Sequence, residues 1–370
     1  MFKDLKVIEL ASVLAGPGVG QFFAELGAEV IKIENLTTGG DVTRSWKLKE
    51  EKSDDLSAYF CSCNWGKKSV AIDLGTEEGK RIVQKLVAQC DLVIASYKPG
   101  DAEKLGVSYE QLVPINNQLI YGQITGYGSS NDRVGYDAVI QAESGFMEMN
   151  GEKNGPPLKM PVALIDVLAG HQLKEGLLLA LLKKEKTGMG SFVEVSLIQT
   201  AMASLVNQAT NWLVAGKLPS RQGSAHPNIA PYGDVFETSD GKRVLLAVGN
   251  SRQFQDLLSI LRIDNIGSLP EYSSNESRVV NRNALNEILA KAISTIDSDQ
   301  FLSKLNSLKV PAGKLQNVKE LFEMPESKEM FIHHGPLIGV RSIAVSGLGA
   351  ASLTPPPRFG EHTKEILSRL

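Results

Sequence analysis

The first 34 residues alternate between strand and helix patterns, and this alternation most constrains the fold. Residues 5–10 (LKVIEL) and 29–34 (EVIKIE) are short apolar runs typical of buried strands. Between them, the small, glycine-rich residues 11–20 predict a loop, and residues 21–26 carry a brief apolar helical pattern. Strand, turn, helix and strand in this order form a βαβ unit, which implies a parallel sheet with helices packed on it.

The same alternation continues through residue 214 and places the chain in the α/β class. Apolar runs predict further strands, and longer periodic stretches predict helices. The expected strands are residues 68–74, 92–96, 119–124 and 192–196, and the expected helices are residues 77–89, 137–149, 167–184 and 197–214.

The composition changes at residues 216–231, which are rich in Gly, Pro, Ser and Asn and mark a candidate crossing between domains. Beyond them, residues 232–237 and 244–248 flank the turn Ser239-Asp240-Gly241, which is a hairpin signature. Three helical patterns follow, so a smaller α+β unit is expected; they cover residues 252–261, 278–292 and 298–308. The tail predicts a strand at 338–345 and a short helix at 361–370.

Composition and charge exclude several classes of protein. The 370 residues carry a net charge of −3 without a long basic run, which argues against nucleic-acid binding. No uncharged apolar stretch is long enough to span a membrane. The N-terminus resembles neither a signal nor a transit peptide, and the three cysteines follow no disulfide or zinc pattern, so cytoplasmic location is the default expectation. The five histidines form no metal-binding motif, so no metal is expected.

A glycine cluster, residues 16–20, follows the first predicted strand where a phosphate could meet a helix N-terminus. Glu34 ends the next strand, where an acid binds ribose in dinucleotide folds. The spacing disfavours NAD, however, because Gln21 stands where G-x-G-x-x-G requires glycine and Pro17 removes an amide. The alternative is close packing of a tight turn against the sheet.

Several lysines lie next to predicted strands, namely Lys67, Lys68, Lys98 and Lys104. Scattered lysines usually form solvated faces. Ligands of open α/β sheets bind at strand ends, however, so a phosphate-binding role is the second interpretation.

Asp166 is the lone carboxylate in residues 161–173 (PVALIDVLAGHQL), which are otherwise mostly apolar or small. As a structural residue it is expected to cap a helix that starts at Val167. As a chemical residue, a partly desolvated carboxylate is a good nucleophile toward an activated acyl group. The two roles are compatible, and residues alone leave both open.

Segments along the whole chain resemble one family, the class III CoA-transferases of the CaiB/BaiF type, which include formyl-CoA and carnitine CoA-transferases. The N-terminal segments are VLAGPGVGQFFAELGAEVIKIE (13–34), GGDVTRSW (39–46), NWGKKSVAIDL (64–74), SYKPGDAEKLG (96–106) and GYDAVIQAESGFM (135–147). The later ones are VALIDVLAG (162–170), KTGMGSFVEVSL (186–197), GSAHPNIAPY (223–232), AVGNSRQF (247–254) and PPPRFGEHTKEIL (355–367).

The resemblance implies a fold and an assembly. It implies a Rossmann-like large domain with a parallel sheet, built from residues 1–220 and completed by 330–370. Residues 225–325 would form the small α+β domain. Two subunits of the family thread through each other as interlocked rings, so a homodimer is implied.

The resemblance also implies a reaction in which CoA moves from an acyl-CoA to a free carboxylic acid, without a tightly bound cofactor. Asp166 matches the family's nucleophile, which forms a mixed anhydride and then an aspartyl-CoA thioester. Gly249 and Asn250 match a loop that excludes water. The implied CoA contacts are Val13, Leu14, Ala15, Ile72, Leu74, Ser96, Tyr97, Lys98, Lys104, Arg133 and Tyr136.

The chain departs from the family at two places, because Ser96-Tyr97-Lys98 replaces Asn-Phe-Arg and Asn35 replaces a basic residue. The nearest rival is an α-methylacyl-CoA racemase, whose G-H-D motif here reads Gly135-Tyr136-Asp137. An unperturbed tyrosine, with a pKa near ~10, is a poor base, which disfavours racemisation. A nicotinamide oxidoreductase and a non-catalytic CoA-binding protein are the remaining alternatives.

Overall fold

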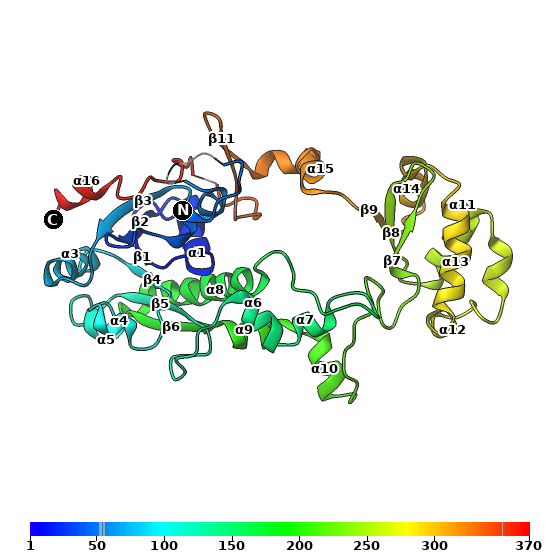
Figure 1. Cartoon of the computed structure of the whole chain (residues 1–370), viewed down its shortest axis with the longest axis horizontal. Helices are drawn as coiled ribbons and strands as arrows, with labels where there is room; N and C mark the ends of the chain where they lie inside the picture. The colour runs from blue at the N-terminus through cyan, green and yellow to red at the C-terminus, as the bar shows by residue number, and fades with distance from the viewer. Residues whose placement is uncertain (52–53, 55, 350) are drawn as a thin grey trace. The chain divides into compact units, whose positions relative to one another are not determined.

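The computed structural model describes residues 1–51, 54, 56–349 and 351–370, and the chain divides into two units. Unit 1 comprises residues 1–146, 159–217 and 328–370, and unit 2 comprises residues 147–158 and 218–327. Both termini therefore belong to unit 1 (Figure 1). The segment 147–158, which the family resemblance would place in the large domain, belongs to unit 2.

Unit 1 is built on a parallel six-stranded sheet, which confirms the predicted α/β class. The strand order is β3-β2-β1-β4-β5-β6, and every neighbouring pair is parallel. The strands are β1 (Lys6–Leu10), β2 (Glu29–Asn35), β3 (Lys67–Ile72), β4 (Leu92–Ala95), β5 (Ile120–Thr125) and β6 (Ser191–Ser196). From β1 the chain adds β2 and β3 on one side of the sheet, and from β4 it adds β5 and β6 on the other side. The direction of strand addition therefore reverses between β1 and β4. In such sheets the ligand crevice lies at this switch point.

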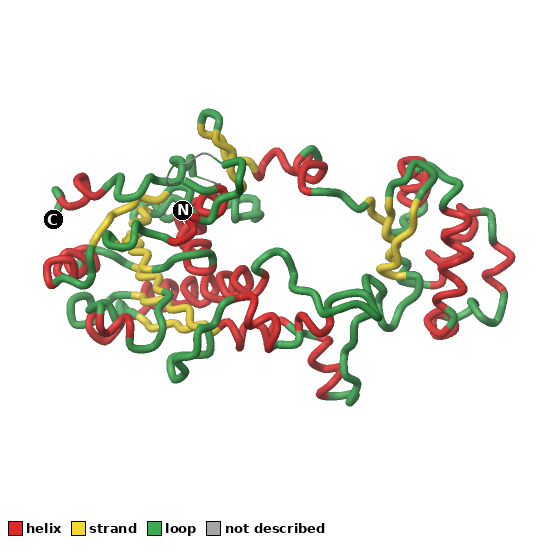
Figure 2. Tube along the Cα trace, viewed as in Figure 1, coloured by secondary structure: helices red, strands yellow, loops and turns green. Residues whose placement is uncertain are grey.

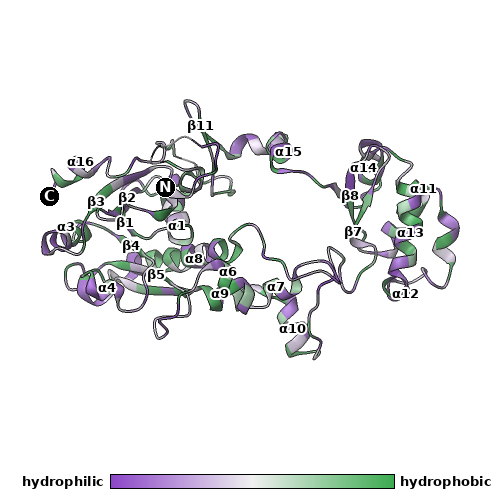
Figure 3. Cartoon of the chain, viewed as in Figure 1, coloured by the Kyte–Doolittle hydropathy of each residue, from purple (hydrophilic) through white to green (hydrophobic). Residues whose placement is uncertain are grey.

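Both faces of this sheet are buried, as the continuous apolar strands predict. One face packs against α1 (Ala15–Glu25) and α8 (Leu164–Thr187), whose Phe23, Ala169 and Leu173 meet alternate strand residues. The other face packs against α3 (Glu77–Val87) through Val83 and Leu86. Helices α1 and α8 lie together in Figure 1, and green, hydrophobic residues line α8 and α9 (Leu197–Ser204) in Figure 3.

Helix α1 begins at Ala15, so the prediction of a loop through residue 20 is wrong. Its glycines permit close packing: a Cβ on Gly16 would lie 2.4 Å from that of Ala11, and one on Gly20 would lie 1.9 Å from a carboxylate oxygen of Glu9. Pro17 falls in the first helical turn, where its missing N–H is tolerated. The glycine cluster therefore serves helix-to-sheet packing.

Two other predicted helices are each broken in two. Residues 137–149 form α6 (Asp137–Glu143) and α7 (Phe146–Met149), separated at Gly145, whose φ is +84°. Residues 197–214 form α9 and α10 (Asn207–Leu213), separated at Val206, whose φ is +48°. A left-handed residue interrupts the helical path, which the apolar periodicity does not reveal.

Short elements complete unit 1. They are the 3₁₀ helix η1 (Val42–Ser45), α2 (Ala58–Cys61), α4 (Asp101–Lys104), α5 (Tyr109–Leu112), the hairpin of β10 (Phe331–His334) and β11 (Leu337–Val340), and α16 (Thr363–Leu367). The expected strand at 338–345 is thus shorter and paired locally. Among the residues that the structure describes, no helix is both long and apolar enough to cross a membrane.

Unit 2 contains the predicted hairpin, formed by β7 (Tyr232–Glu237) and β8 (Arg243–Ala247), with β9 (Ala312–Lys314) as a third antiparallel strand. Helices pack against this sheet, and the sheet and helices together enclose a hydrophobic core within unit 2 (Figure 2). They are α11 (Ser251–Leu261), α12 (Asn275–Val280), α13 (Arg282–Ile293) and α14 (Ser298–Ser307). The expected helix 278–292 is divided at Asn281. Shorter helices are η2 (Asp264–Ser268) and α15 (Val318–Phe322), and η3 (Pro325–Met330) begins in unit 2 and ends in unit 1.

Candidate active site

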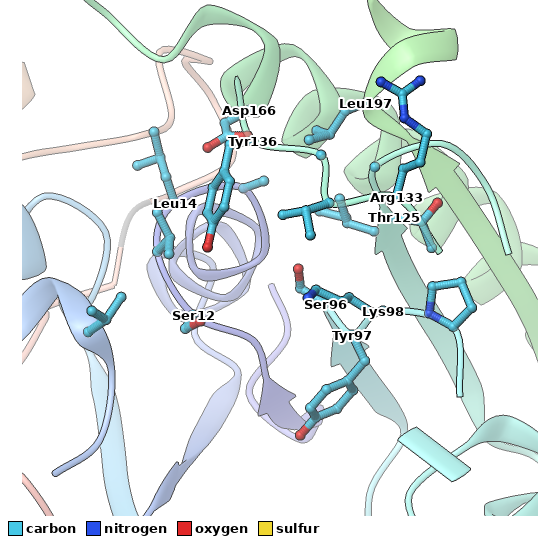
Figure 4. Close-up of a pocket in the computed structure, with 18 residues that line it drawn as sticks. Ser12, Leu14, Ser96, Tyr97, Lys98, Thr125, Arg133, Tyr136, Asp166 and Leu197 are labelled. Atoms are coloured by element: carbon cyan, nitrogen blue, oxygen red, sulfur yellow. The ribbon is translucent and has the colours of Figure 1, made fainter. Parts of the chain in front are cut away.

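A cavity of about 240 Å³ lies at the carboxyl ends of β1, β4 and β5, at the switch point of the sheet. Its walls come from the β1–α1 turn, the loops after β4 and β5, and the starts of α8 and α9 (Figure 4). Nine of the predicted site residues line it: Val13, Leu14, Ala15, Ser96, Tyr97, Lys98, Arg133, Tyr136 and Asp166. The structure therefore gathers at one site residues that lie far apart in the sequence.

Asp166 is the third residue of α8 and lies in its first turn. The prediction that it caps this helix is wrong, since the cap position is Ala163. The capping acceptor comes from another helix instead, because Asp137 Oδ1 accepts the N–H of Ile165 at 2.8 Å. The carboxylate of Asp166 is thus released from a structural role and lines the cavity.

The surroundings of Asp166 make its carboxyl group unusually basic. Burial raises the pKa of Asp166 to about 7, and the nearby carboxylate of Asp137 adds to the increase. The first helical turn acts in the opposite direction, because the peptide dipoles of α8 favour negative charge there. Within the described residues the carboxylate accepts no hydrogen bond. A carboxyl group half ionised near neutral pH and without a partner is available for chemistry.

Two cations line the same cavity. Arg133 stacks over the ring of Tyr127 at 4.3 Å and pairs with Glu143, so its position is fixed. Lys98 is exposed and takes part in no ion pair within the described residues. The cavity thus combines one carboxylate with positive charge that could meet an anionic ligand.

The β1–α1 turn forms part of the lining of this cavity. Leu14 and Ala15 line it, and within the described residues their N–H groups donate no hydrogen bond, as is usual at the start of a helix. Val13 before them has a φ of +73°, an uncommon value for a β-branched residue that costs about 1–3 kcal/mol.

A second cavity of about 220 Å³ lies beside the first, at the ends of β1, β2 and β4. Ser12, Ser96 and Tyr97 line both cavities, so together they extend along the carboxyl edge of the sheet. Glu34 and Asn35 line the second cavity. Glu34, however, accepts hydrogen bonds from Arg44 and Ser69, which leaves it engaged within the protein. The ribose-binding interpretation of Glu34 therefore has no support in the structure.

Other predicted residues lie elsewhere. Ile72 and Leu74 pack in the core on the α3 side of the sheet, and Lys104 pairs with Asp101 on the surface. Gly249 and Asn250 belong to unit 2, where Asn250 caps α11 by accepting the N–H of Gln253. None of these five lines either cavity.

Lys67 and Lys68 do not bind phosphate at this site, so that interpretation is wrong. They begin β3, at the end of the sheet opposite the cavity. Lys67 is buried and contacts Glu9, Asn64 and the carbonyl of Pro17, while Lys68 pairs with Glu29 and Glu365.

Sequence reasoning missed several residues of the site. Ser12, Thr125, Val134 and Leu197 also line the cavity. Ser12 and Thr125 follow predicted strands by one or two positions, so their location at the carboxyl edge could have indicated them. The sequence motif Gly135-Tyr136-Asp137 gives no sign that Asp137 caps α8. The capping hydrogen bond joins Asp137 to Ile165, which lies far from it in the sequence.

The chain matches the model of CoA-transferase family III over residues 2–363. It is similar to a succinate–glutarate CoA-transferase of Agrobacterium fabrum, with 37% identity over 99% of this chain and 94% of the relative. The chain belongs to CoA-transferase family III. A human succinyl-CoA:glutarate CoA-transferase is 34% identical, over 100% of this chain and 85% of the relative. The fold of this CoA-transferase is similar to that of a CaiB/BaiF family protein from Brucella suis, with a TM-score of 0.88, 38% identity and coverage of 99% and 98%.

Family membership makes the protein an enzyme that acts on CoA thioesters. The alternative function as a racemase lacks support. The racemase motif G-H-D contains a histidine, whereas no histidine is found among the described residues that line the cavity. In the described residues no three His, Cys, Asp or Glu side chains gather in a way that would hold a metal ion.

Proposed function

We propose that this CoA-transferase moves CoA from an acyl-CoA to a small dicarboxylic acid, with Asp166 as the covalent nucleophile. The observation that carries the proposal is the placement of Asp166. Its carboxyl group has a raised pKa, lacks a hydrogen-bond partner among the described residues, and belongs to a residue that lines the cavity at the switch point. A carboxylate that is only weakly solvated is more reactive toward a thioester than a hydrated one.

In the first half-reaction, a carboxylate oxygen of Asp166 attacks the carbonyl carbon of the thioester. The C–S bond breaks, CoA leaves as a thiolate, and a mixed anhydride joins the acyl group to Asp166. The thiolate then attacks the aspartyl carbon of the anhydride and releases the donor acid as a carboxylate. Asp166 now carries CoA as a thioester, and no proton has been gained or lost.

The second half-reaction repeats these steps in reverse with the acceptor acid. Its carboxylate attacks the aspartyl thioester, CoA leaves, and a second anhydride forms. The thiolate then attacks the acceptor's carbonyl carbon and regenerates the carboxylate of Asp166. Because one thioester replaces another, the exchange needs no external energy source.

The N–H groups of Leu14 and Ala15 are suited to stabilising the oxyanion that develops in each attack. Leu14 and Ala15 line the cavity, their N–H groups have no partner in the described residues, and fixed backbone donors are effective in such sites. Tyr136 also lines the cavity and is exposed, so it is available to contact the thioester or the acid. We infer that Gly249 and Asn250 serve the exclusion of water, as their match to the family implies.

The CoA moiety is expected to extend from the first cavity along the carboxyl edge into the second. The shared residues Ser96 and Tyr97 would contact it in both, and Lys98 supplies a cation for its phosphates. Ile72, Leu74 and Lys104 stay predicted contacts on the basis of the family match alone. A homodimer of interlocked subunits likewise stays a prediction.

A dicarboxylic acceptor is supported by charge and by the relatives, which are named for succinate and glutarate. One carboxylate of such an acid reacts at Asp166, and the other needs a cation. Arg133 lines the cavity, and its guanidinium, which pairs with Glu143, has further N–H donors for that second carboxylate.

The proposal is tested by mixing the purified enzyme with succinyl-CoA and glutarate and following glutaryl-CoA and succinate by mass spectrometry. We expect both products in equal amounts. Pentanoate is the matched control acceptor, because it has the chain length of glutarate and lacks the second carboxylate. We expect its transfer to be at least ~10-fold slower, since it has no second carboxylate to contact Arg133. Exchange of the α-proton of a 2-methylacyl-CoA in D₂O, without transfer to any acid, would overturn the proposal in favour of a racemase.

A further inference from the structure

The turn between β1 and α1 is held in a strained conformation by side chains from outside it. Val13 has a φ of +73°, which glycine adopts readily and a β-branched residue does not. Val13 also lines the first cavity, immediately before Leu14 and Ala15. Strained residues persist only where their surroundings hold them, and they concentrate at functional sites.

Three side chains hold this turn, and we call them the turn clamp: Lys32, Asp41 and Cys63. Lys32 Nζ donates to the carbonyl of Ala11 at 2.7 Å, and Asp41 Oδ1 accepts the N–H of Val13 at 3.3 Å. The thiol of Cys63 donates to the carbonyl of Val13 at 3.5 Å. The peptide groups on both sides of the Val13 Cα are therefore fixed.

The turn clamp is itself buried and charged. The second oxygen of Asp41 lies 2.8 Å from Lys32 Nζ, and both side chains are at most 1% exposed. Asp41 Oδ1 also accepts the N–H and the hydroxyl of Thr43, which fixes its position. A buried ion pair with several hydrogen bonds has one favourable geometry, so it can impose a strained conformation on the backbone beside it.

We propose that Asp41, held by Lys32, is a positioning residue that keeps Val13 left-handed and thereby presents Leu14 and Ala15 to the acyl-CoA. The proposal rests on the proposed function for its ligand. Asp41 acts through the backbone of Val13, and its effect on ligand binding should therefore depend on which residue occupies position 13.

The test is a double-mutant cycle on the dissociation constant of CoA, measured by calorimetry. Asp41→Ala removes the acceptor of the Val13 N–H, and we expect CoA to bind at least ~10-fold more weakly, as relaxation of the strained residue implies. In a Val13→Gly background the same substitution should weaken binding only ~2-fold, because glycine occupies the left-handed region without the clamp. An equal weakening in both backgrounds would overturn the proposal.

Asp234→Ala is the matched control for a general loss of stability. Asp234 is likewise buried, pairs with an arginine (Arg282) and accepts a backbone N–H, that of Tyr232, but it lies in unit 2. Its effect on CoA binding should be the same with Val or Gly at position 13. If Asp41→Ala does not fold, Asp41→Leu replaces it, because leucine has a similar shape and likewise offers no acceptor for the Val13 N–H, and the same dependence on residue 13 is expected.

A crystal structure of the Asp41 variant separates this inference from the proposed function. If the wild-type enzyme binds no CoA, the proposed function fails. The φ angle at position 13 in the variant structure still tests the clamp in that case. We expect the φ of Val13 to become negative in the Asp41 variant. A positive φ retained there would refute the clamp whatever the enzyme binds.

Discussion

Replacing Asp166 by alanine is expected to lower the rate of CoA transfer by at least ~10⁴-fold, which is the scale of loss when a covalent nucleophile is removed. The methyl group cannot form the anhydride or the aspartyl thioester, so the acceptor acid has no enzyme-bound thioester to attack. Since Asp166 caps no helix and accepts no hydrogen bond within the described residues, the variant should fold and bind CoA as the wild type does. Transfer within ~10-fold of the wild-type rate would contradict this role.

The same role fixes the dependence of the rate on pH. Only the ionised form of Asp166 attacks, and the pKa of its carboxyl group is raised to about 7. The rate at low substrate concentration should therefore rise with pH up to about 7 and fall tenfold for each unit below it.

Asp137→Asn is the control, because it removes a neighbouring negative charge and keeps an oxygen for the N–H of Ile165. We expect this variant to retain transfer and to shift the acid limb of the profile to lower pH. An unshifted limb would mean that Asp166 does not control the profile.

Replacing Lys32 by methionine is expected to have the largest effect on stability, a loss of about 3–5 kcal/mol in the free energy of unfolding of unit 1. Lys32 on β2 lies opposite Glu9 on β1 and contacts both Glu9 and Asp41, all of them buried. Burial alone would lower the pKa of Lys32, but the charges of Glu9 and Asp41 outweigh it and raise the pKa. Methionine has similar length but leaves Asp41 a buried charge without its cation.

Tryptophan fluorescence in urea measures this effect, because Trp46, Trp65 and Trp212 all belong to unit 1. Lys68→Met is the matched control: Lys68 on β3 pairs with Glu29 and Glu365, but these side chains are 27–42% exposed. An exposed pair contributes ~0–1 kcal/mol, so the control should change little. Equal losses in both variants would contradict the importance of the buried charges.

The parallel sheet could be predicted from the sequence because strand and helix patterns alternate, and because inner strands such as β1 and β4 are buried on both faces and read as apolar runs. The start of α1 could not, because Gly16 and Pro17 normally indicate a loop. Here the glycine lets the helix approach Ala11, and the proline occupies the first turn, where helices tolerate it. The close approach of Gly16 depends on packing against the end of β1, which the local sequence pattern does not reveal.

The site was predicted where chemistry is carried by single residues and missed where it depends on contacts across the fold. Asp166 was recognisable as a lone acid in an apolar stretch. Its capping role was predicted wrongly, because Asp137 on another helix supplies the acceptor for Ile165. Position beside a strand suggested either a solvated face or a phosphate contact for Lys67, whereas its ammonium group is buried against Glu9 and the carbonyl of Pro17.

Chemical trapping of the covalent aspartyl intermediate with hydroxylamine tests the central claim most directly. The wild-type enzyme is incubated with succinyl-CoA without an acceptor acid, treated with hydroxylamine and digested, and its peptides are analysed by mass spectrometry. A covalent aspartyl intermediate predicts a hydroxamate on Asp166 and none in the Asp166→Ala enzyme. Active transfer with an unmodified Asp166, or with the hydroxamate on another carboxylate, would contradict the proposed mechanism.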